Sequence, residues 1–318
     1  MKFLILYLNL LICFSTLLDQ VRKEVVQNSL KKLPYRLNVD ILKMFIEMSK
    51  VKEESSLNDA ESAYFAYRWI ITQIEYDCLG SKFGNSSTLP ATIYKEGKGG
   101  AFGISALFNM ICGFFNIESG SVFGLKKEIT YIPTNLIEIN EYAWNYIIID
   151  NKYYLVDIKP GAGTCSPVDF KFNFNQNDEY FGIEPEASIR FLFPNDKKFQ
   201  FLSEPITEDK FRLQAILDKY FLQNFASITP DIQTIRNQKE ITIKLTVKDP
   251  SIKSLFFIVN YASTNSLGGS TPKTVPIQNG TFEYTLLLSN TCIASIIIKE
   301  DESRKSLGII SYEVIFDK

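Results

Sequence analysis

The sequence predicts an α+β chain in which a helix-rich domain is followed by a small β-sandwich. One observation is the stretch 141–163, EYAWNYIIIDNKYYLVDIKPGAG, where two apolar runs, Tyr146–Ile149 and Tyr153–Val156, flank a short polar turn. This pattern is typical of a β-hairpin. A second observation is a change of texture after Pro230, where short β-branched and aromatic runs alternate with turn residues. The 318 residues are enough for two domains, each with its own core.

Apolar residues before the hairpin recur at helical spacing. The spacing predicts helix from Val21 to about Ser49 with a break at Pro34, and a stronger helix over Asp59–Ile74. A third helix is expected after the Gly97–Gly103 turn and runs to about Phe115. Cys112 lies on the apolar face of that third helix, so we expect it to be a buried thiol.

The C-terminal part of the sequence is predicted to form β-strands. Thr207–Phe225 is predicted to be a linking helix, and Gln278-Asn279-Gly280 is a strong hairpin-turn signal. Several short strands at this spacing predict a β-sandwich of immunoglobulin-like type. The expected strands are Ile241–Val247, Leu255–Tyr261, Thr281–Leu288, Cys292–Lys299 and Gly308–Phe316.

Composition excludes several classes of function. The formal net charge of −2 provides no basic surface, so nucleic acid is not an expected partner. The sequence contains no histidine, which removes the side chain that usually exchanges protons beside a catalytic Cys or Ser. The five cysteines show no CxxC spacing, so neither a metal site nor a cofactor is expected.

The first 20 residues are typical of a secretory signal peptide, because Lys2 precedes an apolar run from Phe3 to Leu18. Cleavage is expected somewhere between Ser15 and Gln20. A buried first helix and an uncleaved membrane anchor are the alternatives, and only the anchor would attach the chain to a membrane. The expected location is outside the cell, at its surface or in the secretory lumen. The sequons at Asn85 and Asn279 are candidate glycosylation sites in that case.

The hairpin resembles the His–Asp hairpin of the transglutaminase-like superfamily, which reads roughly HAWN…WYLVD…WGAG. Tyr142 stands at the position of the family's His, and Asp157 stands at the position of its Asp. Upstream, GKGGAFGISALF over residues 97–108 resembles the motif that carries the family's nucleophilic Cys, and Ala101 occupies that position. The resemblance implies a transglutaminase-like, papain-like fold.

Further motifs extend this resemblance over Asp59–Pro205 in the expected order, and a β-sandwich after such a domain is similar to the kyphoscoliosis-peptidase branch. The motifs are Ile74–Asp77, Asp178–Phe181 and Gln200–Leu202. We therefore expect residues 1–20 as signal peptide, 21–205 as the transglutaminase-like domain, 206–230 as a helical linker and 231–318 as the sandwich.

The resemblance implies chemistry that this chain has lost. In active members a Cys thiolate attacks an amide, the His moves the proton and the Asp orients the imidazole. Ala101 removes the nucleophile, and a tyrosine with a reference pKa of about 10 is a poor base in place of the His. We expect an inactive protein in which Asp157 accepts a hydrogen bond from Tyr142.

A protein or peptide is the expected partner, held in a groove near the former site. The residues expected to line this groove are Gly100, Phe102, Trp144 and Asn145. Two alternatives remain. One is a residual cysteine-dependent peptidase or transamidase that uses Cys165, which follows Asp157 in the next loop. The other is a structural component of a cell-surface assembly.

Overall fold

A computed structural model describes residues 17–129, 137–166, 168–217, 221, 224–262, 267–269, 273–299 and 306–317. The chain divides into two compact units. Unit 1 comprises residues 1–123 and 142–185, and unit 2 comprises residues 124–141 and 186–318. The expected boundaries at 205 and 230 therefore differ from this division, because residues 124–141 and 186–205 group with the C-terminal strands.

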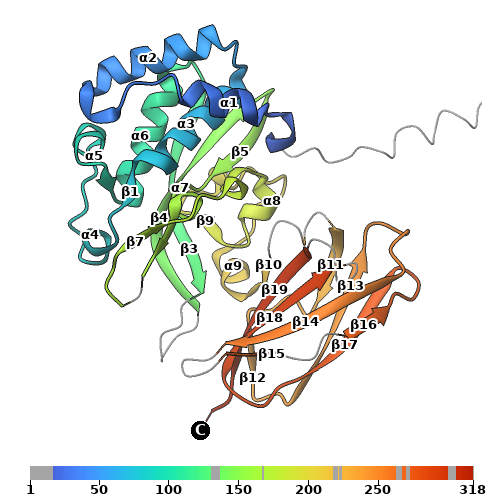
Figure 1. The fold of residues 1–318 in the computed structure, drawn as a ribbon. Helices are drawn as coiled ribbons and strands as arrows, with labels where there is room; N and C mark the ends of the chain where they lie inside the picture. Colours follow the sequence, from blue (N-terminus) through green and yellow to red (C-terminus); the bar gives the residue numbers. More distant parts are fainter. Residues whose placement is uncertain are drawn as a thin grey trace, which may run out of the picture. The chain divides into compact units, whose positions relative to one another are not determined.

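Unit 1 is built around α3 (Asp59–Gln73), which was predicted at nearly these bounds. A capping box starts this helix: Asn58 Oδ1 accepts from the Glu61 backbone N–H at 2.9 Å, and Glu61 Oε2 accepts from the Asn58 N–H at 3.0 Å. Figure 1 shows the other helices of this unit gathered around α3. They are η1 (Leu17–Gln20), α1 (Lys23–Leu30), η2 (Arg36–Asn38), α2 (Ile41–Glu54), α4 (Cys78–Lys82), α5 (Pro90–Glu96), α6 (Ala101–Phe114), α7 (Ile158–Ala162) and η3 (Asp178–Tyr180).

The predicted hairpin forms the sheet of unit 1. Strands β4 (Ile137–Ile149) and β5 (Lys152–Val156) pair antiparallel, with Asn145 opposite Val156. Asp150 and Asn151 have φ of 50° and 61°, as a tight turn with left-handed central residues requires. Strands β8 (Phe181–Ile183), β5, β4 and β3 (Ser119–Ile129) follow one another in the sheet. Two further pairs are β1 (Glu75–Tyr76) with β2 (Lys98–Gly99) and β6 (Gly163–Cys165) with β7 (Phe172–Phe174).

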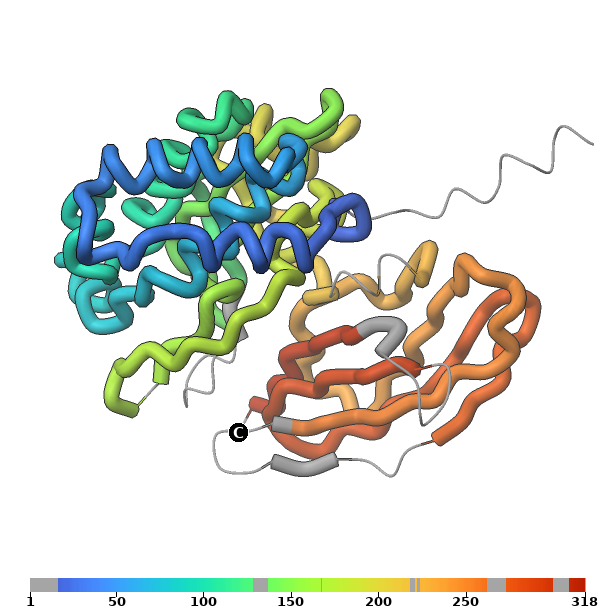
Figure 2. Tube along the Cα trace, turned by 45° about the horizontal axis from the view of Figure 1, so that its top comes forward, coloured from blue at the N-terminus to red at the C-terminus, as the bar shows by residue number. Residues whose placement is uncertain are grey.

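The N-terminal segment is part of this unit. Leu17 has no exposed surface and Val21 is 8% exposed, and both belong to the core that α3 and α6 share. The short blue turn of η1 leads directly into α1 in Figure 2. The expected signal-peptide boundary at residue 20 therefore falls inside the folded unit, because Leu17 and Leu18 supply apolar contacts to it. Residues 1–16 lie outside the described residues.

Unit 2 contains two sheets that share one apolar core, a β-sandwich as predicted (Figure 1, orange and red). The rings of Phe257 and Phe282, one from each sheet, lie 5.5 Å apart between centroids. One sheet orders β10, β19, β18, β14 and β15, with β12 beside β19 and β16 beside β14, and the other orders β11, β13 and β17. The bounds are β10 (Ile216–Leu217), β11 (Phe225–Thr229), β12 (Thr234–Arg236), β13 (Glu240–Val247), β14 (Ser254–Ala262), β15 (Leu267–Gly269), β16 (Lys273–Pro276), β17 (Thr281–Leu287), β18 (Cys292–Lys299) and β19 (Ser306–Ile315).

The expected linking helix over Thr207–Phe225 is too long. Helix α9 (Glu208–Leu213) begins at a Thr207 cap and ends where Gln214 becomes extended. Ile216 and Leu217 then pair with β19, so tertiary pairing overrides local helix propensity here. The remaining elements before it are α8 (Pro185–Ser188), β9 (Leu192–Pro194) and η4 (Lys197–Gln200).

Candidate functional site

The β4–β5 hairpin brings Tyr142 and Asp157 together. The Tyr142 hydroxyl donates a hydrogen bond of 2.6 Å to Asp157 Oδ1, which confirms the predicted contact. Tyr142 is 5% exposed and Asp157 is fully buried. A hydroxyl bonded to a carboxylate at this distance is among the stronger hydrogen bonds in proteins. The two positions that the sequence resemblance assigns to a base and to its orienting acid are thus bonded to each other.

Helix α6 places Ala101 at its first residue, directly after the Gly100 N-cap. No side chain caps this helix, and a Cβ on Gly100 would lie 2.8 Å from the Cβ of Ser86. A helix N-terminus stabilises a thiolate through its dipole and its free N–H groups. The start of α6 could therefore stabilise a thiolate, but the side chain at this position is the methyl group of Ala101.

Ala101 and Tyr142 line one small cavity, with a volume of about 10 Å³. One water needs roughly 10–15 Å³, and a site for an organic ligand needs several hundred. The cavity therefore holds at most a water molecule. Its lining residues are Ala101, Ile104, Ser105, Tyr142, Ala143, Trp144, Asn145, Ile158 and Lys159.

The four residues expected to line a groove do not form an open one. Trp144 is 2% exposed and Asn145 is fully buried, and both face the small cavity. Gly100 is buried and lies outside the lining. Phe102 points elsewhere: it is 42% exposed and stacks on Phe123, which is 49% exposed. Little space is left at these residues, because Asn145 bonds to Ser105 and Asn109 of α6 and the Trp144 side chain is buried.

A buried polar network ties α6 to β3 and β4 beside the cavity. Ser105 Oγ donates to Ser121 Oγ at 2.8 Å and contacts the Trp144 carbonyl oxygen at 3.2 Å. Asn145 Nδ2 donates to the Ser105 carbonyl at 2.9 Å and to Asn109 Oδ1 at 2.8 Å. Ser105 thus points inward, and its hydroxyl serves packing. Asn145 Oδ1 has no hydrogen-bond partner among the described residues, which leaves an acceptor suited to a single water.

Lys159 lines the cavity from the first turn of α7, directly after Asp157. Its ammonium lies 5.0 Å from the centre of the Tyr76 ring and 5.8 Å from that of Tyr142. Both distances fall within the range of cation–π attraction. Lys159 thus adds a cationic, half-buried contact over Tyr142.

The thiols of the described residues are paired or buried. Cys165 forms a disulfide with Cys78, 87 positions away in sequence. Cys112 is fully buried as predicted, and burial raises its pKa to about 12. Burial also raises the pKa of Cys292 to about 11. A disulfide sulfur is not a nucleophilic thiolate, so the structure contradicts the alternative that assigned this role to Cys165.

Sequence reasoning missed several residues of this region. Asn109 and Ser121 join the network, yet only the spacing of Asn109 one turn after Ser105 on α6 hinted at a shared face. Cys78 was not assigned as the partner of Cys165, since pairing cannot be deduced from cysteine positions alone. Among the described residues, no group of three or more His, Cys, Asp or Glu side chains is placed to hold a metal ion.

Both candidate glycosylation sites are exposed. Asn85 lies in the loop after α4, and Asn279 lies in the turn that connects β16 to β17, with φ of 52°. No helix within the described ranges is both long enough and apolar enough to cross a bilayer.

Comparison with known proteins agrees with this geometry. Residues 48–158 match the family model of the transglutaminase-like superfamily. The kyphoscoliosis peptidase of Mus musculus is 25% identical over 236 residues, covering 69% of this chain and 36% of the relative. That of Homo sapiens is 25% identical over 192 residues, covering 58% and 29%. The chain thus spans about a third of the length of these curated relatives. A Parabacteroides distasonis crystal structure, assigned provisionally as a protease, aligns at 10% identity over 92% of this chain and 52% of that one; its TM-score of 0.28 is too low to carry an argument.

Proposed function

Because the chain contains a transglutaminase-like domain, we propose that it is an exported, non-catalytic member of this superfamily that binds a protein or peptide. On this proposal the chain keeps the fold of the superfamily and has lost its catalytic reaction. Both relatives are named peptidases. Each is about three times as long as its part that matches this chain.

The lost reaction is argued from the three positions that would carry it. Acyl transfer by this family's chemistry begins with a thiolate at the start of α6, and Ala101 has no group that ionises. The next step needs a proton acceptor beside the nucleophile, and the Tyr142 hydroxyl is instead donated to Asp157. Loss of a triad member leaves roughly a thousandfold acceleration at best, from the surrounding pocket. A pocket that holds only one water provides little of this residual acceleration.

One observation carries the proposal. The Tyr142–Asp157 hydrogen bond and the Ala101 methyl face the same cavity of about 10 Å³, where an active member needs a thiolate, a base and room for a substrate.

Export is supported by the disulfide as well as by the apolar start of the chain. Structural disulfides persist in oxidising compartments and are rare in the cytosol. The Cys78–Cys165 bridge joins α4 to β6 across 87 positions.

Binding is best supported at the exposed aromatic pair near the former site. The Phe102 and Phe123 rings lie 5.6 Å apart with 15° between their planes, and both are more than 40% exposed. Exposed aromatic surface of this kind is enriched at protein interfaces. We assign the partner surface to this pair and not to the closed cavity.

The test of inactivity compares four purified chains: wild type, Ala101→Cys, Tyr142→His and the double variant. Each is assayed for amine incorporation into a glutamine-containing protein and for peptide hydrolysis, with iodoacetamide labelling mapped by mass spectrometry. We expect no turnover by the wild type and no labelled thiol in the native chain. Labelling at position 101 in the single Cys variant would report a thiol that the helix start activates. Turnover by the wild type would overturn the proposal.

The test of binding uses the wild-type chain as bait on the exported proteins of its own source. A captured protein is then titrated against wild type, Phe102→Ser and the matched control Phe174→Ser, since Phe174 is 50% exposed elsewhere in unit 1. Weaker binding by the Phe102 variant alone supports the assigned surface. Equal binding by all three chains would place the partner elsewhere.

A further inference from the structure

Leu17, the first described residue, is seated in the core of unit 1. It has no exposed surface, and η1 packs against β8. Gly182 of β8 has φ of +70°, and a Cβ built on it would lie 2.8 Å from the Cβ of Leu17. The Leu17 side chain thus occupies the space that a side chain at position 182 would need.

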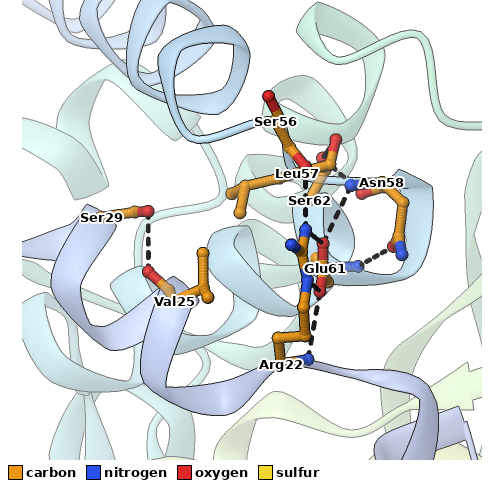
Figure 3. A network of polar contacts seen from close by, with 8 residues as sticks. All are labelled: Arg22, Val25, Ser29, Ser56, Leu57, Asn58, Glu61 and Ser62. Atoms are coloured by element: carbon orange, nitrogen blue, oxygen red, sulfur yellow. Dashed lines mark hydrogen bonds and ion pairs between the residues drawn. The ribbon is translucent and has the colours of Figure 1, made fainter.

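The residues that follow are fixed by a polar clamp on α3 (Figure 3). Arg22 Nε and Nη2 donate to the two carboxylate oxygens of Glu61 at 2.5 and 2.7 Å, and the Arg22 backbone N–H donates to Oε1 at 3.1 Å. Arg22 Nη2 also donates to the Ser56 carbonyl at 2.9 Å. Glu61 is fully buried and is the same residue that closes the α3 capping box. The chain from Leu17 onward is therefore an integral part of the folded unit.

This seating limits where a leader can be removed. The apolar run extends to Leu18, so composition alone allows a cut anywhere up to Gln20. A cut after Leu17 would take away a core side chain, and loss of a buried leucine is strongly destabilising. The bond must lie on the N-terminal side of Leu17.

The residues just before Leu17 point to one bond. Signal cleavage requires small residues at the first and third positions before the cut. Ser15 and Cys13 meet this rule for the bond between Ser15 and Thr16, whereas the two neighbouring bonds place Phe14 at one of these positions. We propose that the exported chain is cleaved between Ser15 and Thr16, so that Leu17 becomes its second residue. Water adds across the bond, leaving a carboxylate on Ser15 and an amino group on Thr16. This assignment rests on the export part of the proposed function.

The test expresses the full chain in a secreting eukaryotic cell and determines the first residue of the secreted protein by intact mass and N-terminal peptide mapping. We expect Thr16. A first residue at Leu18 or beyond would overturn the argument from Leu17, and one at Leu17, or at Ser15 or earlier, would overturn the choice of bond. A chain retained in cells with its leader attached would contradict export itself, so the two failures are distinguishable.

A second measurement tests the seating of Leu17 independently of cleavage. Secreted Leu17→Ala is compared with wild type and with Gln20→Ala, because Gln20 is exposed in the same element. We expect the Leu17 variant to lower the Tm by about 5 °C or more and the Gln20 variant to leave it within about 1 °C. Equal Tm values for all three chains would remove the reason for placing the cut before Leu17.

Discussion

The Tyr142 hydroxyl and the Asp157 carboxylate form a buried hydrogen bond of 2.6 Å at the positions that the sequence resemblance assigns to a base and its orienting acid. The carboxylate is fully buried, so it depends on donors from the protein for its solvation. Tyr142 has become a structural partner of Asp157, and this role leads to the first prediction.

Replacing Tyr142 by Phe removes one hydroxyl donor from a buried acceptor and keeps the ring. We expect the free energy of unfolding to fall by about 1–3 kcal/mol, because a buried carboxylate loses a charge-assisted hydrogen bond. Urea unfolding followed by tryptophan fluorescence measures this. Tyr35→Phe is the matched control, since Tyr35 is 62% exposed. A loss no larger than that of the control would show that Asp157 does not rely on Tyr142.

The Cys78–Cys165 disulfide leads to a second prediction. Replacing both cysteines by serine removes a cross-link between residues 87 positions apart, so the unfolded chain gains conformational entropy. We expect a loss of about 2–4 kcal/mol in stability. Thermal unfolding with and without a reducing agent supplies the control: reduction should lower the Tm of the wild type and leave that of the double variant unchanged. Equal sensitivity of both chains to reduction would mean that this disulfide is not the source of the effect.

Lys127 of β3 gives a prediction in unit 2. It is 4% exposed, and its ammonium donates to the Gln214 carbonyl at 3.0 Å and lies 4.7 Å from the centre of the Phe211 ring. Burial, aided by the nearby charge of Arg190, lowers the pKa of Lys127 from its usual 10.5 to about 7. Between about pH 7 and 10.5 the unfolded chain binds the proton that the folded chain has released, so this residue makes stability rise with pH.

The measurement is urea unfolding of the wild type and Lys127→Met at several pH values between 7 and 10. We expect the free energy of unfolding of the wild type to rise with pH more steeply than that of the variant, by up to about 1.4 kcal/mol per pH unit. Lys210→Met is the control, because Lys210 is exposed on α9. Parallel pH profiles for wild type and the Lys127 variant would contradict the prediction.

Much of this fold was predictable where local signals agreed with packing. The hairpin turn at Asp150 and Asn151 needed left-handed residues, and its flanking runs were apolar and β-branched, so both strands were identified correctly. Helix α3 carried its own N-terminal signal in Asn58 and Glu61. The contact between Tyr142 and Asp157 followed from aligning two motif positions.

Other features depend on contacts that no local pattern encodes. The small size of the cavity arises because Asn145 bonds to α6 and Trp144 is buried, while a strand sequence alone does not say how much space is left beside it. Lys127 follows another lysine in sequence and reads as solvent-exposed, although both are buried. Leu17 is continuous in sequence with the apolar run that begins at Phe3, so only its place beside Gly182 assigns it to the folded chain.

The last prediction concerns the clamp between Glu61 and Arg22. The Arg22 guanidinium, by hydrogen bonding, lowers the pKa of Glu61 from its usual 4.5. A carboxyl with a depressed folded pKa contributes stability that is present above about pH 4.5 and is lost as the pH falls through the folded value. Glu61→Gln keeps the shape of the side chain and removes its charge. We expect the variant to be about 1–2 kcal/mol less stable at pH 7, because charge-assisted bonds to Arg22 and to the α3 start are weakened.

Two comparisons test whether the loss of stability comes from the contact between Arg22 and Glu61. At pH 3 the difference in stability between wild type and Glu61→Gln should shrink, since the stability that comes from the lowered pKa of Glu61 is lost as the pH falls. Combining Glu61→Gln with Arg22→Gln should cost less than the sum of the two single changes, because both remove the same contact. Lys23→Gln serves as the control, since Lys23 is exposed beside Arg22 and does not bond Glu61. Strict additivity of the two changes would show that the N-terminal segment is held by its apolar contacts alone.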